Sequence, residues 1–231
     1  MSEHVLDLRG VNKRFGAVHA LTDVDFHVDA GEVVALVGDN GAGKSTLVKT
    51  ISGVNLADSG EFRFLGKPAS IKSPIDATGL GIATVYQDLA LADNLDVAGN
   101  LFLGHVDFSA GPLRWLWMID DIRMEKESSE LIRSLSARIP SVTTPVASLS
   151  GGQRQIVAIS RALLGEPKLV MLDEPTAALG VAQTRQVLDL IHELKQRGHA
   201  VIARTTSSRV VSLVMNSPAE NGDTPPAEVA S

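Results

Sequence analysis

One segment near the N-terminus constrains the fold more than any other part of the chain. Residues 33–37 (Val-Val-Ala-Leu-Val) form a short, mostly β-branched apolar run, which is typical of a strand buried on both faces of a parallel sheet. A glycine-rich loop follows over residues 38–43, and residues 44–51 then place apolar side chains at helical spacing. This unit has the order strand, loop, helix. The order helix, strand, helix, strand that continues along the chain predicts an α/β protein with a mainly parallel sheet.

The loop and the first residues of this helix fit the pattern G-x-x-x-x-G-K-[ST] between a strand and a helix, which is the context the pattern requires. Glycines let several backbone N–H groups turn toward phosphate oxygens, and the helix N-terminus adds partial positive charge. We expect Lys44 to reach the β- and γ-phosphates and the Ser45 hydroxyl to ligate Mg²⁺. The alternative is a glycine turn with a chance lysine. The predicted triphosphate-binding residues are Gly38, Asp39, Asn40, Gly41, Ala42, Gly43, Lys44, Ser45 and Thr46.

A second buried-strand pattern ends in two carboxylates. Residues 169–172 are all apolar and are followed directly by Asp173 and Glu174. Ligands of open α/β sheets bind at this carboxyl end of the strands, so we expect Asp173 to hold Mg²⁺ through water and Glu174 to act as a general base toward an attacking water. An isolated acidic pair after a strand is often only a solvated loop; the phosphate loop makes the catalytic interpretation the favoured one.

A third motif, Leu-Ser-Gly-Gly-Gln-Arg-Gln over residues 149–155, opens an apolar helix. Ser150 can cap that helix, and the adjacent glycines leave backbone N–H groups accessible. By itself the segment fits an ordinary capped helix after a glycine turn. As a functional element it is a second anion-binding helix terminus, which would close over a γ-phosphate held by another chain if two chains pair head-to-tail.

Composition excludes several classes of protein. The 231 residues are 44% hydrophobic and 21% charged, with a formal charge of −6 and no cysteine. These values predict one soluble domain, argue against broad binding to nucleic acid, and exclude disulfides, Cys-ligated zinc and thiol catalysis. No apolar run reaches the roughly 18 residues that span a bilayer, and the N-terminus does not resemble a signal peptide. We therefore expect a cytoplasmic chain with at most a peripheral membrane role.

The remaining patterns organise the chain around this core. Residues 6–28 alternate as short strands do, a helix is predicted over 182–197, and a third buried strand begins at residue 200. The middle section differs because it favours helix, including a predicted helix over residues 123–137. We interpret it as an inserted helical lobe.

Together, GDNGAGKST, LSGGQRQ and LVMLDEPTAALG resemble the motifs of ABC transporter ATP-binding subunits, and VYQDLALADNLDVAGNLFLGH is similar to the monosaccharide-importer branch of that family. The resemblance covers roughly residues 4–202. It implies a P-loop NTPase core with an inserted helical subdomain at about 88–150 and N-terminal antiparallel β strands. It also implies ATP and Mg²⁺ as cofactors.

Further residues gain a role only from this resemblance. Phe15 matches the aromatic side chain that stacks on adenine, although a lone Phe in an early strand otherwise favours core packing. Gln87 matches a loop glutamine that touches Mg²⁺ and the attacking water, where the alternative is a surface polar residue. The resemblance assigns catalysis to Glu174, Gln87 and Lys44, the metal to Ser45, Gln87 and Asp173, and closure of the partner's nucleotide site to Ser150, Gly151, Gly152 and Gln153.

The resemblance also implies partners and a location. It predicts a head-to-tail homodimer around two ATP molecules, bound to membrane permease subunits at the cytoplasmic face of the inner membrane. A periplasmic sugar-binding protein would feed that permease, and ATP hydrolysis would energise sugar import, without nucleic acid. The alternative is a soluble ABC ATPase that acts on ribosomes or DNA, although such proteins usually carry two cassettes or long coiled-coil arms, which this chain lacks.

The sequence departs from the family pattern in two places. Gly180 stands where the family usually has aspartate. After Ile202 the family continues with apolar residues and Ser-His-Asn, whose histidine contacts the γ-phosphate, whereas this chain reads Ala-Arg-Thr-Thr and has no histidine after His199. Residues 203–231 are predicted to be an aberrant, disordered tail.

A shifted reading frame is one explanation for this tail. Arg-Thr-Thr can be encoded as CGC-ACA-ACN, and the same bases in the neighbouring frame can encode Ser-His-Asn. The other explanation is genuine divergence with a flexible tail. Either way, loss of the histidine predicts weak hydrolysis, and a catalytically impaired or inactive ATPase remains an alternative to the working enzyme.

Overall fold

The computed structural model describes residues 4–39, 41–104 and 120–205. The chain divides into two compact units. We call them the sheet unit (Met1–Gln87, Gly165–Ala178 and Ile191–Ser231) and the helical unit (Asp88–Leu164 and Leu179–Leu190).

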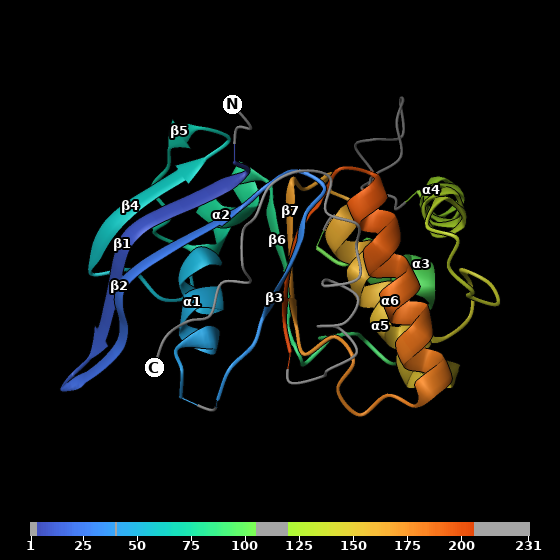
Figure 1. The fold of residues 1–231 in the computed structure, drawn as a ribbon. Coiled ribbons are helices and arrows are strands. Elements are labelled where there is room, and N and C mark those ends of the chain that lie inside the picture. Colours follow the sequence, from blue (N-terminus) through green and yellow to red (C-terminus); the bar gives the residue numbers. More distant parts are fainter. Residues whose placement is uncertain (1–3, 40, 105–119, 206–231) are drawn as a thin grey trace. The chain divides into compact units, whose positions relative to one another are not determined.

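An antiparallel sheet forms the N-terminal part of the sheet unit (Figure 1). Its strand order is β2-β1-β4-β5. Leu6 pairs with Val28 and Leu8 with Phe26, so the apolar residues that alternate along these strands share one buried face. This confirms the predicted N-terminal antiparallel strands. The strands are β1 (Leu6–Phe15), β2 (Val18–Val28), β4 (Ser59–Phe64) and β5 (Lys67–Pro68).

A second, parallel sheet has the order β3-β8-β7-β6. Its β7 and β8 strands are buried along nearly their whole length, which explains their continuous apolar sequences. The strands are β3 (Val33–Leu36), β6 (Ile82–Val85), β7 (Leu169–Asp173) and β8 (Ala200–Arg204). Strand β8 therefore continues two residues past the expected limit of 202.

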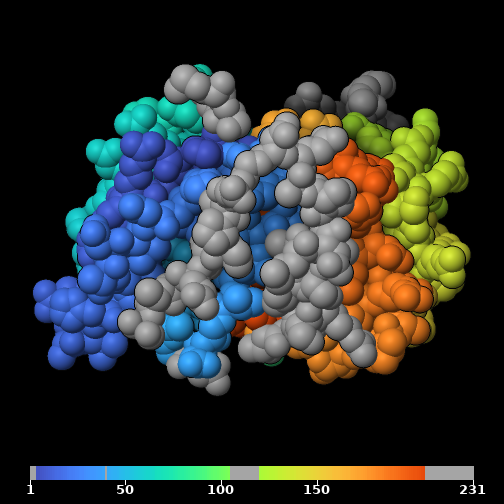
Figure 2. Space-filling view, in the orientation of Figure 1, coloured from blue at the N-terminus to red at the C-terminus, as the bar shows by residue number. Residues whose placement is uncertain are grey.

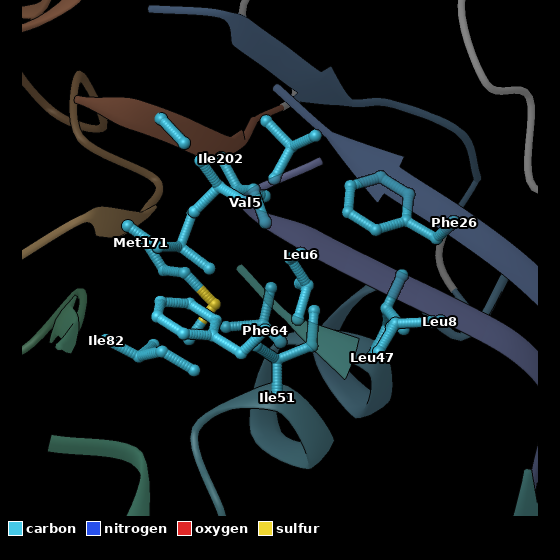
Figure 3. Close-up of a cluster of buried hydrophobic side chains, with 14 of the residues drawn as sticks. Val5, Leu6, Leu8, Phe26, Leu47, Ile51, Phe64, Ile82, Met171 and Ile202 are labelled. Carbon is cyan, nitrogen blue, oxygen red and sulfur yellow. The ribbon is translucent and has the colours of Figure 1, made fainter. Parts of the chain in front are cut away.

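The two sheets share one core with helix α1 (Lys44–Ile51), whose bounds match the sequence prediction. Side chains from both sheets and from α1 converge in this core, among them Leu6, Met171, Ile202 and Ile51 (Figure 3). A further helix, α2 (Pro74–Leu80), begins at a Ser73 cap and precedes β6. This core fixes the loop before α1 against the ends of the parallel strands.

The helical unit has a separate core. Residues such as Val97, Leu101, Ile132 and Val157 pack together there. Its elements are α3 (Val97–Leu101), α4 (Asp121–Ser134), a 3₁₀ turn (Val146–Ser148) and α5 (Gly151–Leu163). Helix α6 (Val181–Gln196) begins in this unit and ends in the sheet unit.

The helix predicted over 123–137 lies two to three residues earlier in the structure. The Asp120 side chain accepts from the backbone N–H of Arg123 and caps the start, while Ser136 adopts a left-handed φ of 52° beyond the end.

Within the described residues, no helix combines the length and apolar character needed to cross a bilayer. The predicted limits of the nucleotide-binding domain (4–202), of its helical subdomain (88–150) and of the aberrant tail (203–231) stay predictions. Residues 206–231 lie outside the described part of the chain.

Candidate functional site

The loop before α1 requires glycine at its last position. Gly43 precedes the helix with a left-handed φ of 79°. A Cβ at this position would lie 2.5 Å from the carbonyl oxygen of Ala20, which is closer than real Cβ contacts allow. Among the described residues no side chain caps α1, so the amides of its first turn stay open for an anion.

Lys44 is the first residue of α1 and folds back over this loop. Its Nζ donates to the carbonyl oxygens of Gly38 and Asp39, each at 2.6 Å, and only 5% of the residue is exposed. The ammonium therefore lies inside the loop where the phosphates are predicted to bind. The structure describes every residue of the predicted loop except Asn40. Thr46 lies in the first helical turn, where its carbonyl accepts from the Thr50 hydroxyl.

The carboxyl end of the parallel sheet collects the other predicted catalytic residues. Asp173 ends β7, and Glu174 follows it with a left-handed φ of 50°. Strand β6 pairs Val85 with Leu172 of β7, so Gln87, two residues past β6, reaches the same edge. Parallel pairing thus brings Gln87, Asp173 and Glu174 to the sheet edge that also leads into the phosphate loop.

Arg204 also lies at this edge, and the sequence analysis did not assign it to the site. It ends β8, whose backbone carbonyl at Arg204 accepts from the N–H of Glu174 at 2.8 Å. Its guanidinium donates through Nε to Oδ1 of Asp173 and through Nη1 to Oγ of Ser45 at 2.5 Å. The only available signal was a basic residue at the end of a buried strand, and its partners are 31 and 159 positions away.

The predicted Mg²⁺ site has suitable donors but an unsuitable arrangement. A hydroxyl and a carboxylate are oxygen ligands that Mg²⁺ accepts. In this structure, however, the Ser45 hydroxyl and the Asp173 carboxylate both accept hydrogen bonds from the guanidinium of Arg204. A divalent cation between these oxygens would meet a second cation, so the arrangement does not fit Mg²⁺ as it stands. Elsewhere among the described residues no cluster of three His, Cys, Asp or Glu is placed to hold a metal.

In the helical unit, the segment predicted to clamp a second nucleotide forms the start of α5. Ser150 and Gln153 form a capping box, in which the Gln153 N–H donates to Ser150 Oγ and the Ser150 N–H donates to Gln153 Oε1. The interpretation of this segment as an ordinary capped helix is therefore correct for the isolated chain. Its closure over a nucleotide held by a second chain stays a prediction.

The two glycines of this segment pack against the region before and within α6. A Cβ on Gly152 would lie 2.8 Å from Cβ of Gln183, and a Cβ on Gly151 would lie 3.2 Å from Cδ2 of Leu179. Gly152 is buried whereas Gly151 is exposed. The double glycine thus allows close packing of α5 against α6 as well as an accessible backbone.

The β1–β2 hairpin forms the blue lower-left part of the surface in Figure 2. Phe15 is the last residue of β1, at the tip of this hairpin. It is 47% exposed, so core packing is the wrong interpretation and stacking on a base stays a prediction. Lys13 places its Nζ 5.3 Å from the Phe15 ring centroid and 2.9 Å from Oδ1 of Asp58. The Lys13 hydrogen bond lowers the pKa of the exposed Asp58 carboxyl.

Buried polar side chains organise the loop that begins the helical unit. Asn100, fully buried, donates to the carbonyls of Ala92, Leu95 and Asp96 and accepts from the N–H of Ala92. Arg161 of α5 donates to the carbonyls of residues 89 and 90, and burial lowers its pKa. These bonds fix the segment that follows Gln87 in the chain.

Comparison with known proteins identifies the family. The ABC transporter family matches residues 21–177. The chain is 47% identical over 201 residues to a xylose/arabinose import ATP-binding protein of Sulfolobus acidocaldarius and 45% identical over 202 residues to a fructose import ATP-binding protein of Rhizobium meliloti. Each alignment covers 87% of this chain and 78% of the relative.

Solved structures agree. The ADP conformation of an ATP-binding cassette of an ABC transporter matches 90% of this chain and 83% of its own, with a TM-score of 0.77 and 29% identity. A dimeric post-hydrolysis cassette bound to ADP and Pi matches 90% of both chains, with a TM-score of 0.68 and 25% identity. The chain belongs to the ABC transporter family, as an ATP-binding cassette of the ATP-hydrolysing class. The predicted P-loop NTPase fold is confirmed.

Proposed function

We propose that this chain is the ATP-binding and ATP-hydrolysing subunit of a carbohydrate importer. The position of Lys44 carries the proposal: its Nζ lies within the glycine loop, hydrogen-bonded to the carbonyls of Gly38 and Asp39. This loop lies at the sheet edge where Asp173 ends β7 and Glu174 follows it. The names of the sugar-import relatives favour the transport role over a soluble ABC ATPase.

In this proposal the loop amides and Lys44 bind the phosphates, and Phe15 stacks on the adenine. Stacking on an exposed aromatic ring is worth about 1–3 kcal/mol and tolerates different bases. Glu174 accepts a proton from the attacking water, and Gln87 positions that water.

We further propose a head-to-tail homodimer. In it, the exposed backbone of Gly151 closes on the nucleotide of the second copy, beside Ser150, Gly152 and Gln153. The dimeric cassette with ADP and Pi supports this assembly. The dimer would act on permease subunits as a peripheral protein at the cytoplasmic face of the inner membrane, with a periplasmic sugar-binding protein supplying the permease.

Replacing Lys44 tests the nucleotide site directly. Lys44→Ala removes the ammonium from the loop and should weaken ATP binding by about tenfold or more, because charge-assisted contacts to phosphate are among the strong ones. Lys49→Ala removes an exposed ammonium from the last turn of the same helix and should change the affinity less than about twofold. Equal effects in a fluorescent ATP titration would contradict the proposed site.

A slowed enzyme tests the dimer. Glu174→Gln keeps the shape of the side chain but removes its basicity. Hydrolysis should therefore be slow, and ATP-bound dimers of the chain should accumulate. Sedimentation velocity with and without ATP measures the pairing. The control is Glu166→Gln, another residue with positive φ, at 47°. Monomers in every condition, even after the C-terminal frame is repaired, would contradict the proposed dimer.

A catalytically impaired cassette is a second candidate, which rests on the sequence at the end of β8 and which the comparisons do not favour. The sequence has no histidine after His199, which precedes β8 and contacts the carbonyl of Pro167 through Nδ1 at 2.8 Å. Losing one group that handles charge or a proton at the γ-phosphate costs about 10²–10⁴-fold in rate. Phosphate release that rises by this factor once the histidine frame is restored would support impairment, whereas full turnover by the present chain would exclude it.

A further inference from the structure

The end of strand β8 occupies a central place in the sheet unit. β8 lies between β3 and β7, and Arg204 pairs with Leu36 on one side and with Asp173 on the other. The chain leaves β3 directly into the phosphate loop. A side chain at the carboxyl end of β8 is therefore next to both the loop and the acidic end of β7, because all these strands run in parallel.

Arg204 uses this place to join two residues that come from different elements. Its Nε donates to Asp173 at the end of β7, and its Nη1 donates to Ser45 in the first turn of α1. The Arg204 side chain is 17% exposed and that of Asp173 16%. The pair is thus mostly shielded from water, where ion pairs are screened less than on the surface.

The two hydrogen-bond partners of Arg204, Ser45 and Asp173, carry oxygen atoms of a kind that can bind a cation. A hydroxyl oxygen and a carboxylate oxygen beside a phosphate loop are the donor types that hold Mg²⁺ in P-loop NTPases. A guanidinium supplies a permanent positive charge and directed N–H donors to the same oxygens. The guanidinium therefore places positive charge beside these oxygens through hydrogen bonds, whereas Mg²⁺ would bind them as metal ligands.

We propose that Arg204 is a built-in cation that takes the place of Mg²⁺ between Ser45 and Asp173, so that this chain binds ATP without requiring a divalent cation. The inference rests on the proposed ATP site at the loop of residues 38–45. Mg²⁺ bound between Ser45 and Asp173 would lie beside the Arg204 guanidinium, which already donates to Oγ of Ser45 and Oδ1 of Asp173. Mg²⁺ thus competes with part of the protein instead of completing the site.

The dependence of ATP binding on Mg²⁺ tests this exchange. The affinity for methylanthraniloyl-ATP is measured with excess Mg²⁺ and with excess EDTA, in the full chain and in Arg204→Gln and Arg204→Ile. The wild type should bind with less than about a threefold difference between the two conditions. Both variants should prefer Mg²⁺ by about tenfold or more, since the two oxygens then lose their cation.

Two controls separate the possible failures. Arg9→Gln removes an exposed guanidinium paired with Asp7 and should keep the wild-type ratio. Lys44→Ala should weaken binding in both conditions. No binding by the wild type in either condition overturns the proposed ATP site, and the inference with it. Binding that prefers Mg²⁺ by tenfold in the wild type overturns the inference alone, even if the Arg204 variants do not fold.

A second measurement does not rely on the fluorescent group. Thermal unfolding of the wild type should shift upward by the same amount with ATP and EDTA as with ATP and Mg²⁺, because a ligand stabilises according to its affinity. In Arg204→Gln the shift should be larger with Mg²⁺. An identical Mg²⁺ response in both proteins would overturn the inference.

Discussion

The helices α1 and α5 both begin after glycine-containing turns, and both starts were predicted to bind phosphate, yet the structure completes them differently. At α1 the cap position is Gly43, in a left-handed conformation, and no described side chain caps the helix. At α5 the cap is Ser150, and its side chain and that of Gln153 close a capping box. A glycine cap leaves the first amides open, whereas a serine cap satisfies part of them within the chain.

Charge divides the two helix starts in the same way. The α1 start has two cations, Lys44 on the loop carbonyls and Arg204 on Ser45. The first turn of α5 has Arg154, which instead contacts Asp93 at 3.3 Å and the carbonyl of Ala147. In the proposed dimer, α1 would hold the triphosphate with cations of its own chain, while α5 would add to a site whose charges the other copy supplies. The following substitutions test this difference.

The largest effect is expected at the α1 start. Gly43→Ala forces a Cβ to within 2.5 Å of the Ala20 carbonyl at a φ of +79°. The left-handed conformation alone costs about 1–2 kcal/mol, and relieving the overlap brings the loss of unfolding free energy to about 3 kcal/mol. Urea denaturation measures this loss.

Gly198→Ala is the control for the cost of placing alanine in a left-handed backbone conformation. It has a similar φ of +83° but nothing within 4 Å of the added Cβ, so only about 1 kcal/mol should be lost. Equal losses in the two variants would show that the contact with Ala20 does not shape the loop.

The next effect concerns the packing of α5. Gly152→Ala places a Cβ 2.8 Å from Cβ of Gln183. Alanine favours helix by about 1 kcal/mol over glycine, but overpacking costs about 1–3 kcal/mol, so we expect a net loss of about 1 kcal/mol. ATP binding by the monomer should stay unchanged, because the start of α1 is intact. Thermal unfolding and an ATP titration check the two parts.

Gly79→Ala in α2 is the matched control, since nothing lies within 4 Å of its added Cβ. It should stabilise the chain by about 0.5–1 kcal/mol through helix propensity alone. If Gly152→Ala also stabilised the chain, the close contact with α6 would not limit this position.

How far sequence could predict these features depends on the range of the interactions. Helix α1 was predicted with its final bounds because its start and periodicity are local. Helix α2 was missed although Ser73, Pro74 and Asp76 form a local start signal, in which the Ser73 side chain accepts from the Asp76 N–H. This miss was avoidable.

The contacts of Arg204 were not predictable in the same way. They require the β3-β8-β7 strand order and the register that pairs Arg204 with Asp173. Strand order and register come from the whole sheet and not from neighbouring residues. The same limit applies to the contact between Gly152 and Gln183, for which the sequence indicated a glycine turn but not its packing partner.

Removing the α5 cap tests the closed helix start itself. Ser150→Ala deletes the oxygen that accepts from the Gln153 N–H and should lower the unfolding free energy by about 1 kcal/mol. Ser148→Ala is the control, because Ser148 lies two residues before the cap residue. Its hydroxyl donates to the Pro145 carbonyl and satisfies no amide of α5. Chemical denaturation of both variants measures the difference. Equal losses would mean that the capping box does not stabilise α5.

The smallest expected effect is a gain at the start of α6, where Gly180 stands in place of a side chain that could cap. The Gly180 N–H already donates to Oε1 of Gln183 at 3.2 Å, which is half of a capping box. Gly180→Asp supplies the missing acceptor and should raise stability by a few tenths of a kcal/mol, about the difference between glycine and aspartate caps. Gly180→Ala, which adds bulk without an acceptor, should not stabilise the chain. Differential scanning calorimetry distinguishes the two, and a gain shared by both would assign it to helix propensity instead of capping.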